Sequence, residues 1–91
     1  MKTSELTGAA LDWAVAKAEG YPDEDISVDW NYSTDWQLCG SLIEREKIAL
    51  FLNGNDEWAA TDGIKNSVGD TPLIAAMRCY VASKLGDEIN G

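Results

Sequence analysis

An aromatic and polar segment with the sequence WNYSTDWQLCG, residues 30–40, carries the side chains best suited to hold a small molecule. Trp30, Tyr32 and Trp36 are spaced two and four residues apart, so in an extended segment all three rings would project to one side. Flat rings that stack, together with a few polar groups that fix orientation, are typical of ligand pockets. A carboxylate such as that of Asp35 can accept hydrogen bonds from a base edge or a ribose hydroxyl.

A structural interpretation of the same segment remains open. Aromatic residues of small domains often fill the core, and Trp30 and Trp36 would then lie beneath helices while residues 33–35 form a capped turn. If the segment is a site, the neighbouring IERE sequence adds polar contacts. The candidate ligand-binding residues are therefore Tyr32, Ser33, Thr34, Asp35, Trp36, Glu44 and Arg45.

A pair of carboxylates is the best candidate for catalysis. Glu44 and Glu46 would share a face if IEREK is extended, and two carboxylates can perform acid–base work as in glycosidases. Basic residues alternate with them, however, which is typical of a solvated surface. The chain also has no histidine, which excludes Ser-His-Asp and Cys-His arrangements and histidine zinc sites. We expect a protein that is not an enzyme and that uses no cofactor or metal.

The charge balance restricts the partners. Sixteen acidic and seven basic residues give a net charge of −9, which argues against direct binding to nucleic acid. An anionic ligand would need local Arg, Lys or backbone N–H groups to offset this field. The acidity is compatible with a basic protein partner, with imitation of nucleic acid, or with solubility alone.

The chain shows no signal for export or membrane insertion. Its N-terminus lacks the apolar core of a signal peptide, and no apolar run approaches ~18 residues. We expect a cytoplasmic protein with no membrane partner, in which Cys39 and Cys79 are reduced.

Two helices are expected to frame the candidate site. The 91 residues suffice for one domain, residues 1–91. A helix is predicted over residues 7–19, with Thr7 as N-cap, a staple between Leu6 and Leu11, and Gly20 as stop. A second helix is predicted over residues 71–85, where Thr71 or Asp70 caps and Pro72 occupies the first position.

The C-terminal helix is expected to have one buried stripe, formed by Leu73, Ile74, Met77, Tyr80, Val81, Lys84 and Leu85. Arg78 would then lie at its flank, where a guanidinium can reach a phosphate or a carboxylate, or form a surface salt bridge.

Short strands are predicted over residues 26–30, 48–53 and 57–61. Residues 26–30 alternate between apolar and polar, and Asn53-Gly54 is a strong hairpin signal between the later two. Residues 31–41 show no clear period, and residues 64–70 are predicted to form a loop. The expected fold class is α+β: a small single domain whose N- and C-terminal helices pack on a short antiparallel sheet of about three strands.

Three stretches of the chain resemble the NinX-like family of small phage proteins: MKTSELTGAALDWAVAKAEG, YSTDWQLCGSLIERE and GDTPLIAAMRCYVASKLGDE. Members of the family typically read STDW, a Gly-rich step, an IIERE-type motif and a TPLIAAMR helix, in that order. The chain departs from the pattern at residues 38–43, where LCGSLI stands in place of GGPII. The resemblance implies a phage or prophage origin and expression in a bacterial cytoplasm, and it brings no known activity.

Two functions are compatible with these observations. In the first, the chain is a phage accessory protein that binds and sequesters a small molecule, for example a nucleotide-type host defence signal. Such a protein is expected to be homo-oligomeric. Alternatively, the acidic surface docks on a basic host protein in the manner of a nucleic-acid mimic, through the PDED, NDE and GDE sequences.

Overall fold

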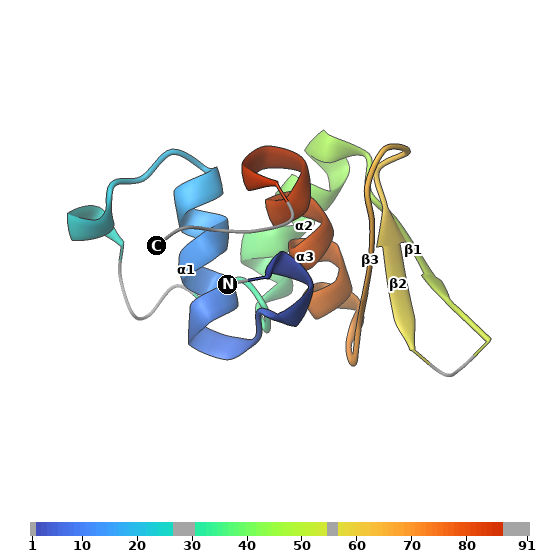
Figure 1. Cartoon of the computed structure of the whole chain (residues 1–91). Helices are drawn as coiled ribbons and strands as arrows, with labels where there is room; N and C mark the ends of the chain where they lie inside the picture. The colour runs from blue at the N-terminus through green and yellow to red at the C-terminus, as the bar shows by residue number, and fades with distance from the viewer. Residues whose placement is uncertain (1, 27–30, 55–56, 87–91) are drawn as a thin grey trace.

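A computed structural model places a three-stranded antiparallel sheet beside one central helix. The structure describes residues 2–26, 31–54 and 57–86. Within them, α3 (Pro72–Leu85) contacts the sheet on one side and α1 (Gly8–Ala18) on the other, and α2 (Trp36–Glu46) packs alongside (Figure 1). Two short 3₁₀ helices, η1 (Thr3–Glu5) and η2 (Asp23–Asp25), flank α1 in the sequence. The expected α+β class is confirmed.

Helix α1 lies where the sequence predicts it. Leu6 and Leu11 are both buried, in agreement with a staple at its start. Thr7 occupies the N-cap position, but its side chain makes no capping hydrogen bond. The prediction of Thr7 as N-cap is thus right in position, while the capping hydrogen bond that the residue type implies is not formed.

Helix α2 lies in a segment for which the sequence predicted no element, since residues 31–41 show no clear period and the pairing of Glu44 with Glu46 depended on an extended IEREK. Asp35 starts the helix by accepting a hydrogen bond from the backbone N–H of Gln37 at 2.9 Å. Lys47 ends it in the left-handed conformation, at φ 56°. Side chains two positions apart on a helix do not face each other, so Glu44 and Glu46 do not form the pair that an extended segment would give.

The sheet has the order β1-β2-β3, formed by Ala49–Leu52, Trp58–Thr61 and Asn66–Gly69. The first two strands correspond to the predicted strands at 48–53 and 57–61. The third was predicted at 26–30, but Ile26 lies outside any strand, and residues 27–30 lie outside the described residues. Residues 66–69, predicted as part of a loop, supply β3 instead.

Close packing against α3 explains why β3 ends in glycine. A Cβ on Gly69 would lie 2.7 Å from Cγ2 of Ile74 and 2.8 Å from the backbone nitrogen of Ala75. No larger residue fits without moving the start of α3. The contact therefore fixes the first turn of α3 against the sheet, and this turn forms one wall of the candidate site.

Helix α3 is buried on more than one side. Thr71 caps it as predicted, accepting a hydrogen bond from the N–H of Ile74 at 3.1 Å. The expected single stripe is wrong for the middle of the helix, because the sheet covers one face and α1 another. Four further residues of the helix are therefore buried: Ala75, Ala76, Cys79 and Ala82.

Arg78 joins three parts of the chain. Its Nε donates to the carbonyl of Leu6 at 2.8 Å, and its Nη1 donates to the carbonyl of Val68 at 2.7 Å. Burial lowers the pKa of Arg78, an effect that Asp70 opposes. Both of these hydrogen bonds go to backbone carbonyls, whereas the sequence indicated a phosphate, a carboxylate or a surface salt bridge.

Among the described residues, no helix has both the length and the apolar character that crossing a bilayer requires.

Candidate functional site

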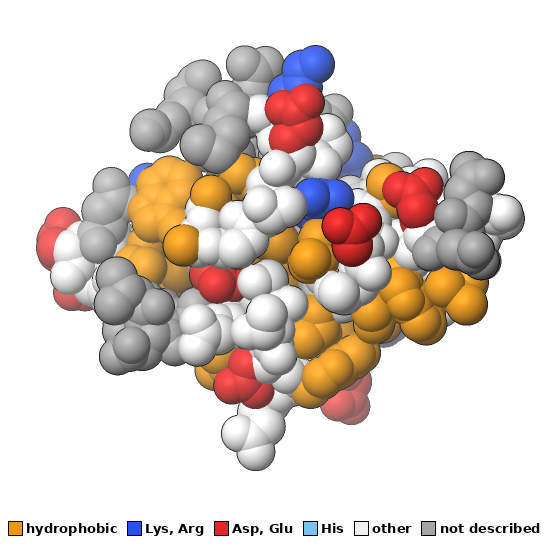
Figure 2. All heavy atoms as spheres, turned by 90° about the horizontal axis from the view of Figure 1, so that it is seen from below, with side chains coloured by type: hydrophobic (Ala, Val, Ile, Leu, Met, Phe, Trp, Pro, Cys, Tyr) orange, Lys and Arg blue, Asp and Glu red, His pale blue; other side chains and the backbone are white. Residues whose placement is uncertain are grey.

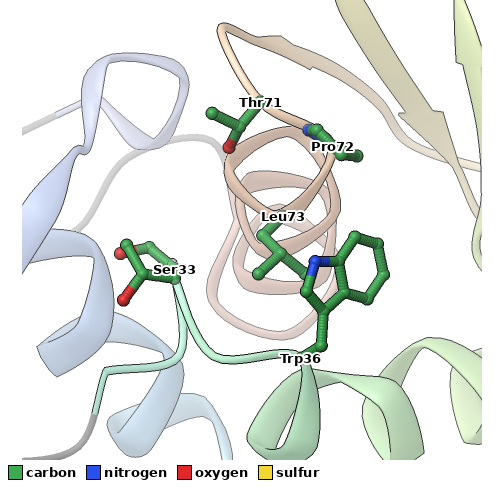
Figure 3. Close-up of a pocket in the computed structure, with 6 residues that line it drawn as sticks. Ser33, Trp36, Thr71, Pro72 and Leu73 are labelled. Atoms are coloured by element: carbon green, nitrogen blue, oxygen red, sulfur yellow. The ribbon is translucent and has the colours of Figure 1, made fainter.

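A hollow of about 250 Å³ lies between the start of α2 and the first turn of α3. Two segments far apart in the sequence form its walls (Figure 3). The lining residues are Ser33, Thr34, Trp36, Thr71, Pro72 and Leu73. The structure thus brings three of the seven predicted ligand-binding residues together and adds three that were not predicted.

Trp36 is the aromatic residue among the described lining residues, and 54% of its surface is exposed. A large ring that is left half-exposed contributes little to the core and offers a face for stacking. Leu73, on the opposite segment, is buried and closes the floor. In the view of Figure 3, the edge of the indole that carries the nitrogen is the one nearer to Ser33.

The expectation that Tyr32 and Trp36 project to the same side is wrong. Tyr32 is only 9% exposed and belongs to the hydrophobic core, whereas Trp36 faces solvent. The cause is the change from a turn at residues 32–34 to helix α2, which breaks the two-residue alternation. Trp30 lies outside the described residues. The core interpretation is therefore also wrong for Trp36, although the capped turn that it included is present.

Hydrogen bonds hold the polar run in place. The N–H of Ser33 donates to Oδ1 of Asp12 on α1 at 2.7 Å. The carbonyl of Asn31 accepts from the N–H of Thr34 at 3.1 Å and from the N–H of Asp35 at 2.9 Å. The backbone of this wall is therefore fixed before any ligand arrives, which lowers the entropy cost of binding.

Asp35 does not line the hollow. Its carboxylate caps α2 and so fixes where the helix begins and where Trp36 leaves the backbone. The residue predicted to contact a ligand thus has a positioning role, and the sequence signal for it was the capping preference of Asp.

Glu44 and Arg45 lie in the last turn of α2, at the opposite end of the helix from the hollow. The guanidinium of Arg45 contacts Glu19, the C-cap of α1, at 3.2 Å, Glu46 at 3.0 Å and the hydroxyl of Tyr80 at 3.1 Å. These contacts raise the pKa of Arg45, the bond to Glu46 most strongly. The polar end of IERE therefore links the three helices, away from the lining residues.

The sequence does not identify the wall contributed by α3 as part of a site. It indicates only a helix cap at Thr71, the first helical position at Pro72 and a buried residue at Leu73. Each of these roles is present, and each residue also lines the hollow. Only the packing of the first turn of α3 beside the start of α2 reveals the second role.

Both cysteines are buried and free. The thiol of Cys39 donates to the carbonyl of Tyr32, and that of Cys79 donates to the carbonyl of Lys65 at 3.4 Å. Burial raises the pKa of Cys39 to about 12 and that of Cys79 to about 11. A thiol with such a pKa is a poor nucleophile at neutral pH. The described part of the chain also holds no cluster of three or more potential metal ligands.

The substituted LCGSLI sequence lies inside α2. Cys39 and Leu42 point into the core, and no residue from 38 to 43 lines the hollow. The departure from the Gly-Gly-Pro pattern therefore falls on the helix that carries Trp36 and outside the lining itself.

Comparison with known proteins agrees with the resemblance carried by the motifs. No curated protein matches the chain. A family model described as "Bacteriophage P22, NinX" matches residues 25–84, about two thirds of the 91 residues. The matched region runs from η2 to the last turn of α3 and includes both walls of the hollow. The chain belongs to the phage P22 NinX family.

Proposed function

We propose that this phage protein binds a small molecule carrying a flat ring in the hollow between α2 and α3, and thereby sequesters it. The observation that supports the proposal most strongly is the meeting of a half-exposed tryptophan with three hydroxyl side chains on a pre-ordered backbone. The ring would stack on Trp36, and the hydroxyls of Ser33, Thr34 and Thr71 would fix its edge. A nucleotide-type defence signal of the bacterial host is the class of molecule that such a counter-defence protein would withdraw.

The size of the hollow supports a small ligand. Ligand pockets commonly measure roughly 300–1,000 Å³, so about 250 Å³ accommodates one ring system and its nearest substituents. Among the residues that the structure describes, the lining includes no carboxylate, thiol, amine or imidazole that could act as a nucleophile or a general base. The proposal is accordingly a binding function without catalysis or a cofactor.

Thermal-shift and mass-spectrometric screening against nucleobases, nucleosides and linear and cyclic nucleotides tests the proposal. A stabilising ligand that remains bound in native mass spectrometry supports it. Failure of every compound to bind folded protein, together with no ligand retained on purification from infected bacteria, would overturn it.

Trp36→Ala is the variant that connects binding to the hollow. Tyr21→Ala is its control, because Tyr21 is a similarly exposed aromatic residue, at 45%, that does not line the hollow. We expect Trp36→Ala to weaken binding by about tenfold or more, since base–aromatic stacking is worth roughly 1–3 kcal/mol. Tyr21→Ala should leave binding unchanged. Equal effects of the two variants would place the ligand elsewhere.

An acidic interaction surface is the second candidate function. Glu24 and Asp25 are exposed in η2. The side chain of Asp23, residue Asp56 of NDE, and residues Asp87 and Glu88 of GDE lie outside the described residues. If docking is the function, replacing Asp23, Glu24 and Asp25 by lysine should abolish the capture of a basic host protein. The same variant should still bind a small ligand in the hollow. Capture that survives the triple change would contradict this alternative.

We also propose self-association in the bacterial cytoplasm, and the outward face of the sheet is the surface that favours it. All three α-helices lie on one side of the sheet (Figure 1). The strand register places six residues on the other side, and none of them is charged: Ala49, Phe51, Ala59, Thr61, Asn66 and Val68. Phe51 and Val68 are exposed, and Figure 2 shows hydrophobic side chains in a band that extends onto the sheet.

Two copies of a chain with a net charge of −9 meet most easily through an uncharged face. Native mass spectrometry of wild-type protein and Phe51→Ser tests this arrangement. A dimer that is lost in the variant supports it, and a wild-type monomer at all concentrations overturns it.

A further inference from the structure

The positions of the basic side chains indicate which part of a ligand the hollow can recognise. All seven Lys and Arg residues of the chain are described, and none lines the hollow: Lys2, Lys17, Arg45, Lys47, Lys65, Arg78 and Lys84. Several of them are held at other places in the fold. Lys17 lies over the ring of Trp13, Arg45 and Lys84 pair with Glu46, and Arg78 binds two backbone carbonyls.

Part of the backbone that could compensate for the missing cations is already used. At the start of α2, the carboxylate of Asp35 accepts the N–H of Gln37, and at the start of α3 the hydroxyl of Thr71 accepts the N–H of Ile74. Pro72 has no N–H to donate. A phosphate entering here would find these first-turn donors reduced in number and would have no cationic side chain beside them.

Negative charge flanks both walls. Asp35 stands between the lining residues Thr34 and Trp36, and Asp70 directly precedes Thr71. Both acidic residues are thus immediate chain neighbours of lining residues, in a chain with a net charge of −9 that repels a phosphate. A neutral ring meets no such repulsion and can still use the indole and the three hydroxyl groups.

We infer that the hollow recognises an uncharged nucleobase or nucleoside and discriminates against phosphate. The inference rests on the proposed small-molecule function and specifies its ligand class. A nucleotide would bind through its base, with its phosphate directed to solvent, and the phosphate would weaken the complex. Removing the phosphate from a ligand should therefore increase affinity.

Calorimetric titration of four nucleosides and their 5′-monophosphates tests the inference directly. At low salt, we expect the best nucleoside to bind about fivefold more tightly than its monophosphate, from roughly 1 kcal/mol of repulsion. Near 0.5 M salt the difference should shrink, because screening shortens the range of exposed charges to a few ångströms.

Thr34→Lys supplies the missing cation at an exposed lining position, and Thr34→Gln is its uncharged control of similar length. The lysine variant should reverse the preference in favour of the monophosphate, whereas the glutamine variant should retain the preference for the nucleoside. In the wild type, a monophosphate that binds as tightly as its nucleoside, or more tightly, overturns the inference and leaves the proposed binding function intact. Absence of binding by either series overturns both.

Discussion

The backbone N–H of Ser33 donates a 2.7 Å hydrogen bond to Oδ1 of Asp12, which lies one turn into α1. This bond connects α1 to the wall of the hollow, although the two residues are 21 positions apart in the chain. Helix α1 does not line the hollow, but it determines where the polar run lies.

Replacing Asp12 by alanine is expected to destabilise the fold by about 1–3 kcal/mol, because the N–H of Ser33 then lacks its partner. Urea unfolding measures the loss. Asp12→Asn is the control, since its side-chain oxygen can still accept the bond. If alanine and asparagine have equal effects, or if neither has any, the bond does not hold this wall.

Asp35→Ala removes the side chain that caps α2 and should lower the free energy of unfolding by about 1 kcal/mol. The same variant should weaken ligand binding indirectly, because Trp36 is the first residue of the helix that the cap fixes. Asp35→Asn retains a good cap and should retain both stability and binding. Loss of binding in the stable asparagine variant would show that the carboxylate contacts the ligand itself.

Arg78→Gln is expected to destabilise the protein by roughly 2–3 kcal/mol, because hydrogen bonds from a charged group to two backbone carbonyls are lost. Lys84→Gln, on the same helix, breaks the exposed pair with Glu46 and removes the ammonium group that lies over the ring of Tyr80, and it should cost about 0–1 kcal/mol. Thermal unfolding of the two variants gives the comparison. A small effect for Arg78→Gln would mean that the N-terminal segment and β3 are held without it.

Stability should fall as the pH rises above 9. In the folded chain the pKa of Cys39 is about 12 and that of Cys79 about 11, against 9.0 for an ordinary thiol. Between pH 9 and 11 the unfolded chain therefore loses thiol protons that the folded chain retains, so alkali favours unfolding. Each cysteine should contribute up to about 1.4 kcal/mol per pH unit.

Tyr80, with its pKa raised to about 12, adds to this loss above pH 10. Urea titrations at pH 8, 9, 10 and 11 measure the total slope. The double variant Cys39→Ala, Cys79→Ala should reduce the slope, even if it lowers stability at every pH. An unchanged slope would show that the thiols titrate normally in the folded protein.

Helices α1 and α3 and strands β1 and β2 could be predicted because each has a local signal. Leu11, Ala14 and Val15 have helical spacing, and Thr71 with Pro72 is a strong start signal. Helix α2 has weaker signals, since Gly40 and Ser41 lie in its middle and Cys39 supplies one of its two buried positions. Strand β3 contains one β-branched apolar residue, Val68, and its pairing with β2 determines its conformation.

The candidate site could be predicted only in part, for a related reason. Ser33, Thr34 and Trp36 were identified because aromatic and hydroxyl groups are unusual together in a core segment. Residues 71–73 became part of the site through tertiary packing, which a local pattern does not contain. Glu44 and Arg45 were included because of their proximity in sequence, and the helical conformation of α2 carries them to its far end.

The central claim is that a flat ligand binds against Trp36, and the indole N–H signals of a ¹⁵N-labelled sample test it most directly. The chain has four tryptophans, so Trp36→Phe identifies the signal of Trp36 by its disappearance. Titration with the best-binding nucleoside should shift this signal first and by the largest amount, with saturation at the calorimetric stoichiometry. A signal of Trp36 that stays unmoved while the ligand binds would contradict the account.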